Sequence, residues 1–347
     1  MSEISNPAAT AMSEPFGISA SGVEVLVHTI ENGRLRMRCI DFGGTVIALE
    51  VPGRRGAENI LLSYDSLEGY ESDSCWCGML CGPVAGRIAG ASFELDGDNH
   101  ELEANDGTSC LHSGSIGFSR SLWRGETFRE PDEAGVRFSL STIPGQWGFP
   151  GGLEISATYT LSRDSLTLAW EARTDSPTLL APTFHGYFNL GGPQSGAVSD
   201  HLLVIDADRF MPLDEIGLPL MPEPVDGTRC DFRRPRSPIG PDGGFDNAFL
   251  LNSSGSGRAA AVTLEHPGSG RRMEVFTDQP ACVLYTGGFL NRSQVFAGGR
   301  AGFPGAALAL ETQWYPNAPA LPDLPQPVIF PGEVYRAATR WRFTVED

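Results

Sequence analysis

The sequence contains no lysine, so all 25 of its basic residues are arginine. This absence excludes a lysine Schiff base, pyridoxal phosphate bound in the usual way, and a Walker A phosphate loop. The 43 acidic residues give a net charge of −18. A chain this acidic lacks the basic surface that nucleic acids and anionic membranes require, so we expect neither as a partner.

Long apolar runs are also missing, and no segment approaches the ~20 apolar residues of a membrane helix. The first 17 residues contain neither a basic region nor an apolar core, so they do not resemble a secretory signal. We expect residues 1–17 to be a flexible leader, and the protein to be cytoplasmic. The seven cysteines are an odd number, which argues against a disulfide framework, so we expect free thiols.

Several catalytic and metal-binding motifs are absent. There is no GxSxG nucleophile elbow and no GxGxxG between a strand and a helix. Cys75, Cys77 and Cys81 are closely spaced, but a zinc site needs a second pair of ligands, and no CxxC or HxxxH follows them. We therefore expect small buried thiols here, no bound metal and no cofactor.

Alternation of polar and apolar residues with a period of two dominates the chain, which also has 42 glycines and 26 prolines. This pattern predicts many short strands joined by turns, as in β-sandwiches and barrels. Helical periodicity is confined to Ser66–Glu71, and no change in composition divides the chain. We predict one all-β domain over residues 18–347. The expected strands include Arg34–Cys39, Val136–Leu140, Leu153–Ala157, Leu166–Trp170, Tyr335–Val345 and a hairpin at Phe93–Leu102.

Two of the six histidines lie in segments typical of functional loops. His112 is followed by a glycine-rich loop, and His185 lies among aromatic and amide side chains. Histidine is the side chain best suited to proton transfer near neutral pH. Either residue could instead be a partly buried structural histidine.

Two carboxylates lie in unusual surroundings. Asp246 follows a glycine pair and a phenylalanine, and Glu311 ends the apolar run of residues 305–310. A buried carboxylate is costly unless it is paired or functional, so both are candidates for a site or for tying loops together. Arg233, Arg234 and Arg236 could bind a phosphate, but a solvated turn is the better explanation of a single basic cluster in a chain of net charge −18.

Ordered motifs along nearly the whole chain resemble the aldose 1-epimerase (galactose mutarotase) family. They are residues 82–88, 93–97, 111–118, 148–151, 159–161, 182–190, 231–233, 244–246, 285–287, 311–313 and 331–333. The resemblance implies a large twisted antiparallel β-sandwich with a sugar site in an open cleft. It also implies that the chain interconverts the α and β anomers of free aldoses and needs no cofactor.

The resemblance also implies roles for individual residues. Glu311 would be the general base that removes the proton from the C1 hydroxyl, and His185 the general acid that protonates the ring oxygen. Three further residues would bind the sugar: His112, Arg87 and Asp246.

Three positions depart from the family pattern. Gly86 and Phe184 replace asparagines that the family often has, and Val283 replaces a glutamine. Lost amides imply lost contacts to sugar hydroxyls, so galactose is not assumed to be the preferred substrate. If galactose were strongly preferred, Asn247 or Gln313 could supply the missing contacts.

Three other functions are compatible with such a fold. One is a non-catalytic carbohydrate-binding or regulatory protein, which would not need both Glu311 and His185. Another is a glycoside hydrolase or lyase, which would require a second, helical catalytic domain that the sequence lacks. The third is a sugar-phosphate epimerase that uses the arginine cluster to bind phosphate.

Overall fold

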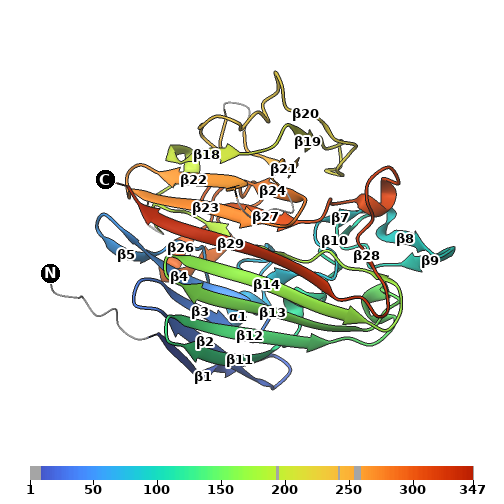
Figure 1. The fold of residues 1–347 in the computed structure, drawn as a ribbon, viewed down its shortest axis with the longest axis horizontal. Helices are drawn as coiled ribbons and strands as arrows, with labels where there is room; N and C mark the ends of the chain where they lie inside the picture. The colour runs from blue at the N-terminus through green and yellow to red at the C-terminus, as the bar shows by residue number, and fades with distance from the viewer. Residues whose placement is uncertain (1–8, 193–194, 241–242, 254–258, 347) are drawn as a thin grey trace.

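The computed structural model describes residues 9–192, 195–240, 243–253 and 259–346. Three antiparallel β-sheets and several two-stranded ribbons form most of the molecule, with one short α-helix (Figure 1). The predicted all-β antiparallel sandwich is therefore confirmed. No helix among the described residues is long and apolar enough to cross a membrane.

The first sheet is formed by the N-terminal strands in sequential order. It contains β1 (Thr10–Ile18), β2 (Glu24–Glu31), β3 (Arg36–Ile40), β4 (Thr45–Gly53) and β5 (Gly56–Asn59).

Strand β1 corrects the expected leader, because residues 10–17 are paired with β2 rather than flexible. The segment alternates weakly and contains a proline and a glycine, so its residue pattern does not predict a strand. Backbone pairing and a 2.8 Å hydrogen bond between Ser13 Oγ and His28 Nδ1 hold it in place. Residues 1–8 of the expected leader lie outside the described residues.

The second sheet has eight strands and forms the broad front layer in Figure 1. In spatial order they are β11 (Arg124–Glu130), β12 (Glu133–Ser141), β13 (Leu153–Ser162), β14 (Ser165–Thr174), β29 (Tyr335–Val345), β23 (Arg271–Thr277), β22 (Val262–His266) and β18 (Leu202–Ile205). The C-terminal strand β29 lies between β14 and β23, so the last strand of the chain joins the two parts of this sheet.

The third sheet has six strands and positions the candidate site. In spatial order they are β17 (Tyr187–Phe188), β27 (Leu308–Gln313), β24 (Ala281–Tyr285), β21 (Asp246–Leu250), β19 (Arg209–Met211) and β20 (Glu223–Pro224).

Shorter elements complete the fold. The two-stranded ribbons are β6 (Leu80–Cys81) with β16 (Thr183–Phe184), β7 (Arg87–Ile88) with β10 (Cys110–Leu111), β8 (Ser92–Leu95) with β9 (Asp98–Glu101), β15 (Thr178–Leu179) with β28 (Val328–Ile329), and β25 (Val295–Phe296) with β26 (Arg300–Ala301). Helix α1 (Leu67–Glu71) confirms the predicted helical turn. Its N-cap Ser66 accepts a hydrogen bond from the Gly69 N–H, and Leu67 and Tyr70 are buried.

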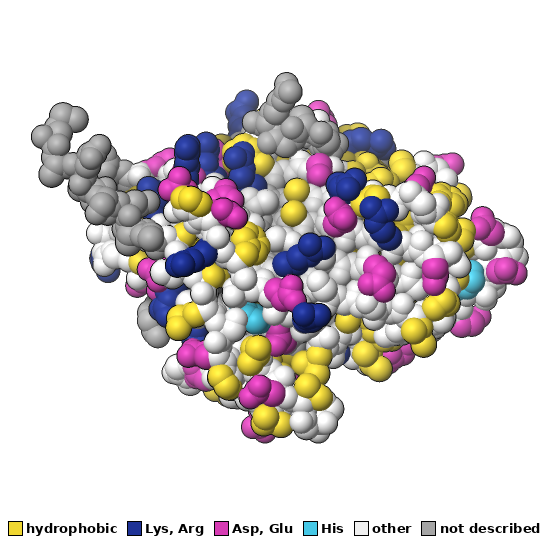
Figure 2. Space-filling view, turned by 60° about the horizontal axis from the view of Figure 1, so that its bottom comes forward, with side chains coloured by type: hydrophobic (Ala, Val, Ile, Leu, Met, Phe, Trp, Pro, Cys, Tyr) yellow, Lys and Arg dark blue, Asp and Glu magenta, His cyan; other side chains and the backbone are white. Residues whose placement is uncertain are grey.

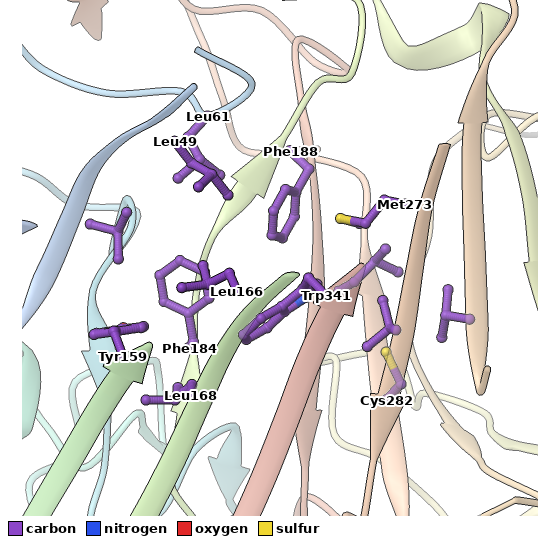
Figure 3. Close-up of a cluster of buried hydrophobic side chains, with 14 of the residues drawn as sticks. Leu49, Leu61, Tyr159, Leu166, Leu168, Phe184, Phe188, Met273, Cys282 and Trp341 are labelled. Atoms are coloured by element: carbon purple, nitrogen blue, oxygen red, sulfur yellow. The ribbon is translucent and has the colours of Figure 1, made fainter. Parts of the chain in front are cut away.

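The main hydrophobic core draws side chains from all three sheets. Trp341 of β29 lies within the cluster that Figure 3 shows. Its ring centroid is 5.7 Å from that of Phe184 and 6.4 Å from that of Phe188. These contacts bury large aromatic area and hold the segment that contains His185 against the eight-stranded sheet.

At strand β27, side chains on both faces of the six-stranded sheet are buried. Leu308 and Leu310 belong to the main core, and Thr312 on the same face is hydrogen-bonded to Thr339 of β29. Side chains alternate across a strand, so Glu311 and Gln313 point to the opposite face, where both are buried.

On the face that Figure 2 shows, acidic and basic side chains are interspersed with apolar ones. On this face the two signs of charge are mixed, and the acidic side chains are not confined to one region.

Candidate active site

A cleft of about 260 Å³ lies on the second face of the six-stranded sheet. Its floor is made of residues from three adjacent strands: Asp246 and Ala248 of β21, Val283 and Tyr285 of β24, and Glu311 and Gln313 of β27. Its walls come from loops distant in sequence and include Trp76, Gly86, Arg87, Asp106, His112, His185, Leu213, Gly217, Pro219, Phe289 and Pro316. This volume is slightly below the 300–1,000 Å³ typical of drug-sized ligands, so it suits a small molecule.

All five predicted site residues line this cleft: Arg87, His112, His185, Asp246 and Glu311. They are separated by as many as 224 positions in the chain, and no local motif in the sequence contains all of them. Their convergence results from the fold.

Glu311 is only 3% exposed, and one of its carboxyl oxygens, Oε2, is buried without a hydrogen-bond partner among the described residues. Its neighbour across the sheet is Val283, which offers no hydrogen bond. Burial, with a smaller contribution from the charge of Asp246, raises the pKa of Glu311 well above its ordinary value.

His185 is held by the backbone on both sides. Its N–H donates to the Met79 carbonyl at 2.9 Å, and its own carbonyl accepts from the Gly78 N–H at 3.0 Å. The ring lies against Tyr187, with centroids 4.9 Å apart. Its Nε2 is 3.5 Å from Glu311 Oε1, and burial lowers the pKa of His185 to about 4.

The two pKa shifts together define the protonation of this pair. Burial disfavours the charged form of each group, which raises the pKa of Glu311 and lowers that of His185. Over a broad pH range the pair therefore holds one proton, either on the carboxyl with a neutral imidazole or on the imidazole beside a carboxylate. These two arrangements differ only in where the proton lies.

His112 is fixed in position and in tautomer by Gly86. Its backbone N–H donates to the Gly86 carbonyl at 3.0 Å, and its Nδ1 accepts from the Gly86 N–H at 3.3 Å. The neutral ring consequently carries its proton on Nε2. Burial, and then the charges of His185 and Arg87, lower the pKa of His112 well below its usual value, so this ring stays neutral and acts as a hydrogen-bond donor.

Arg87 joins two carboxylates at the side of the cleft. Its Nε donates to Asp106 Oδ2 at 2.7 Å, and its Nη1 lies 3.6 Å from Asp246 Oδ2. Burial raises the pKa of Asp246, and Arg87 opposes that rise. The arrangement offers both N–H donors and carboxylate acceptors, which suits a ligand rich in hydroxyl groups.

Two residues of the site, Asp106 and Trp76, are not predicted by any pattern in the sequence. Asp106, which orients Arg87, lies in an Asp-Gly turn that has no distinctive pattern. Trp76 lies between Cys75 and Cys77, and its ring packs on His112 with centroids 4.7 Å apart. An aromatic residue between two cysteines does not by itself indicate a sugar site.

Phe184 does not belong to the site. It is 3% exposed and packs in the main core against Tyr159, Phe188 and Trp341. Its side chain does not line the cleft, so the expectation that this substitution removes a sugar contact is corrected. Gly86 and Val283 do line the cleft.

Among the residues that the structure describes, two groups of side chains have the spacing of metal ligands. The first, His112, His185 and Glu311, lies in the cleft. Gly86 occupies His112 Nδ1, so a metal would have to replace the proton on Nε2.

The second group is Asp200, His201 and His266. His201 Nε2 accepts from the Leu190 N–H, and His266 Nδ1 accepts from the Ser269 N–H. The other ring nitrogens both lie within 3.1 Å of Asp200, to which they can donate. This network uses every ring nitrogen and is explained as a structural tie between loops.

The remaining candidates also have structural explanations. The seven cysteines are buried free thiols, and those of Cys75 and Cys77 donate to Asp73 Oδ1 and the Leu62 carbonyl, respectively. Arg233 forms ion pairs with three carboxylates, those of Asp208, Asp226 and Asp231.

Comparisons with known proteins show sequence similarity over most of the chain. The family model described as aldose 1-epimerase matches residues 27–342. The chain is 37% identical to bovine galactose mutarotase, over 91% of this chain and 93% of the relative. It is 33% identical to the aldose 1-epimerase of Escherichia coli K12, over 96% and 100% of the two chains.

Solved structures give the same result. The crystal structure of galactose 1-epimerase from Lactobacillus acidophilus NCFM matches with a TM-score of 0.85 and 26% identity, covering 98% of this chain and 100% of that one. A homologue of GalM/aldose epimerase from C. elegans matches with a TM-score of 0.83 and 28% identity, covering 90% and 97%.

The shared proton predicts an unusual pH profile. As pH falls through about 4, His185 and Glu311 should both become protonated and the base is lost; as pH rises through the raised pKa of Glu311, the last proton leaves and the acid is lost. We expect kcat/KM for the anomerisation of a free aldose, corrected for the spontaneous rate, to show an acid limb only as the pH approaches about 4. An acid limb near pH 6.5, with the fold intact by circular dichroism, would contradict this assignment.

Proposed function

The chain belongs to the aldose 1-epimerase family, and from this premise we propose how its residues interconvert the α and β anomers of free aldoses. The reaction is an isomerisation by acid–base ring opening and reclosure. The observation that carries the assignment of roles is the buried Glu311–His185 pair, whose Oε1 and Nε2 atoms lie 3.5 Å apart and whose side chains both line the cleft.

The reaction needs one group to take a proton and another to give one. Glu311, as the carboxylate, removes the proton from the C1 hydroxyl, while His185, as the imidazolium, protonates the ring oxygen. The C1–ring oxygen bond breaks and an open aldehyde forms. Each positioned acid or base contributes roughly 10²–10⁴-fold to the rate.

Reclosure follows from the same proton count. After ring opening the carboxyl holds the proton and the imidazole is neutral, which is the arrangement that burial favours for both groups. Rotation about C1–C2 presents the other face of the aldehyde, and the two groups exchange roles as the ring closes. No electrons are transferred, and the pair ends with the proton count with which it began.

Three residues would hold the sugar during this exchange. His112 presents its Nε2–H toward the reacting side of the cleft, and Arg87 with Asp246 would bind hydroxyls at the other side. We propose that residues 18–347 act as one domain, since the cleft takes residues from Ser74 to Pro316. We also propose a cytoplasmic location, which fits seven free thiols.

The alternatives are less well supported. A purely carbohydrate-binding protein would gain nothing from a buried carboxyl whose pKa is raised beside a histidine whose pKa is lowered. A sugar-phosphate epimerase would need free arginines, whereas Arg233 is already bound to three carboxylates.

Replacing Glu311 with glutamine should abolish most of the activity. The amide cannot accept the proton from C1–OH, so kcat should fall about 10²-fold or more while the melting temperature stays close to that of the wild type. Polarimetry on freshly dissolved α-aldoses measures the rate. Glu50→Gln is the control, because Glu50 lies on β4 and pairs with Arg36. A Glu311→Gln enzyme with more than half of the wild-type kcat would place the base elsewhere.

The two histidines should differ in kinetic signature. His185→Ala removes the acid and should lower kcat strongly, whereas His112→Ala removes a positioning donor and should change both kcat and KM. Both variants are measured with one aldose and checked for melting temperature. If His185→Ala changed only KM, the acid would have to be His112.

Substrate preference should be broad. Val283 and Ala248 form an apolar strip beside Glu311, and an apolar wall tolerates a sugar that lacks a hydroxyl there. We expect kcat/KM for galactose to exceed that for the best pentose or deoxy sugar by no more than about tenfold. The measurement covers galactose, glucose, xylose, arabinose and fucose. Val283→Gln should increase the preference for galactose, and a hundredfold preference in the wild type would contradict the proposal.

A further inference from the structure

We infer that the amide of Gln313 binds one hydroxyl of the sugar and makes that hydroxyl a determinant of specificity; this rests on the proposed function. Gln313 follows Glu311 by two residues on β27, so both side chains point to the cleft face of the sheet. It is 1% exposed, and its Oε1 is buried without a partner among the described residues.

The amide is poorly satisfied by the protein itself. Its Nε2 makes one long contact, 3.4 Å, to the carbonyl of the adjacent Trp314. By contrast, Gln279 donates to the Tyr335 hydroxyl at 3.0 Å, and Gln326 Nε2 donates to the carbonyls of Ala318 and Leu324 at 2.9 Å. Buried amides are normally hydrogen-bonded, so an unused acceptor in the wall of a cleft indicates a ligand partner.

Gly86 leaves room beside this amide. A Cβ at position 86 would lie 3.5 Å from Gln313 Nε2 and 2.9 Å from Pro316 Cβ, so a side chain there would enter the space next to the amide. The backbone of Gly86 has φ +77°, which glycine adopts without strain. The glycine at position 86 therefore leaves the space beside Gln313 Nε2 free of a side chain.

The neighbouring residues cannot make the same contact. Val283 has no polar group, and Asn247 does not line the cleft, because it alternates with Asp246 and Ala248 on β21 and donates to the Met211 carbonyl. Of the two amides that the sequence offered as replacements, only Gln313 lines the cleft. A site built to bind a hydroxyl discriminates strongly against an analogue that lacks it.

The test pairs a variant with single-hydroxyl deletions in the sugar. Gln313→Met keeps the length of the side chain and removes both amide atoms. For the wild type we expect one monodeoxy analogue to lose about 5- to 150-fold in kcat/KM relative to its parent aldose. In Gln313→Met that analogue and the parent should agree within about twofold, while the penalties for the other monodeoxy analogues remain.

Matched variants separate binding from packing. Asn247→Ala should keep all the wild-type ratios, and Gln313→Asn, which withdraws the amide by one methylene, should lose the same discrimination as Gln313→Met. If Gln313→Met does not fold, Gln313→Asn provides the same test of discrimination. A uniform loss for every sugar, or unchanged ratios, would overturn the inference. If the wild type accelerated no aldose, the proposed function would fail, and the same ratios measured as Kd by calorimetry would still decide the role of Gln313.

Discussion

The burial of Glu311 beside His185 is the constraint on which the site depends. Burial disfavours the charged form of both groups, so it raises the pKa of Glu311 and lowers the pKa of His185. Because they lie 3.5 Å apart, the two shifts combine into one proton that belongs to the pair. Anomerisation requires one proton to be given to the ring oxygen and one to be taken from the C1 hydroxyl. The burial that is costly for stability therefore provides the acid and the base that we propose for this reaction.

Alternation along short strands turns this constraint into a structure. Leu308 and Leu310 fix β27 in the core, which leaves Glu311 on the other face of the same strand. Phe184 does the same for His185, because its ring is held in the core by Trp341. A core residue thus directly precedes each of the two residues that we propose as catalytic, so the packed core fixes the position of both side chains.

The sequence predicted a strand correctly where the alternation of its residues matches the burial of one face in the folded protein. The alternation in Tyr335–Val345 marked β29 with its observed bounds, because one face of that strand lies in the core. It failed at β1, whose pairing with β2 is largely backbone and needs no alternation. Arg87, His112, His185, Asp246 and Glu311 could be named from motifs. Asp106 could not, because its importance lies in a 2.7 Å contact with Arg87 that only the fold creates. Phe184 was misjudged because the direction of one side chain in a two-residue strand is not encoded locally.

The walls of the cleft show that its geometry is maintained against local strain. Trp76 and His112 have φ values of +56° and +51°, in a region that residues other than glycine rarely adopt and that costs about 1–3 kcal/mol each. Polar contacts offset this cost: the Asp73 carboxylate accepts from the N–H groups of Cys75 and Cys77, on either side of Trp76. Gly86 bonds both the backbone and the ring of His112. Asp73 does not itself line the cleft and acts through Trp76, which does. The shape of the site therefore depends on a residue that need never touch the sugar and that no catalytic motif contains.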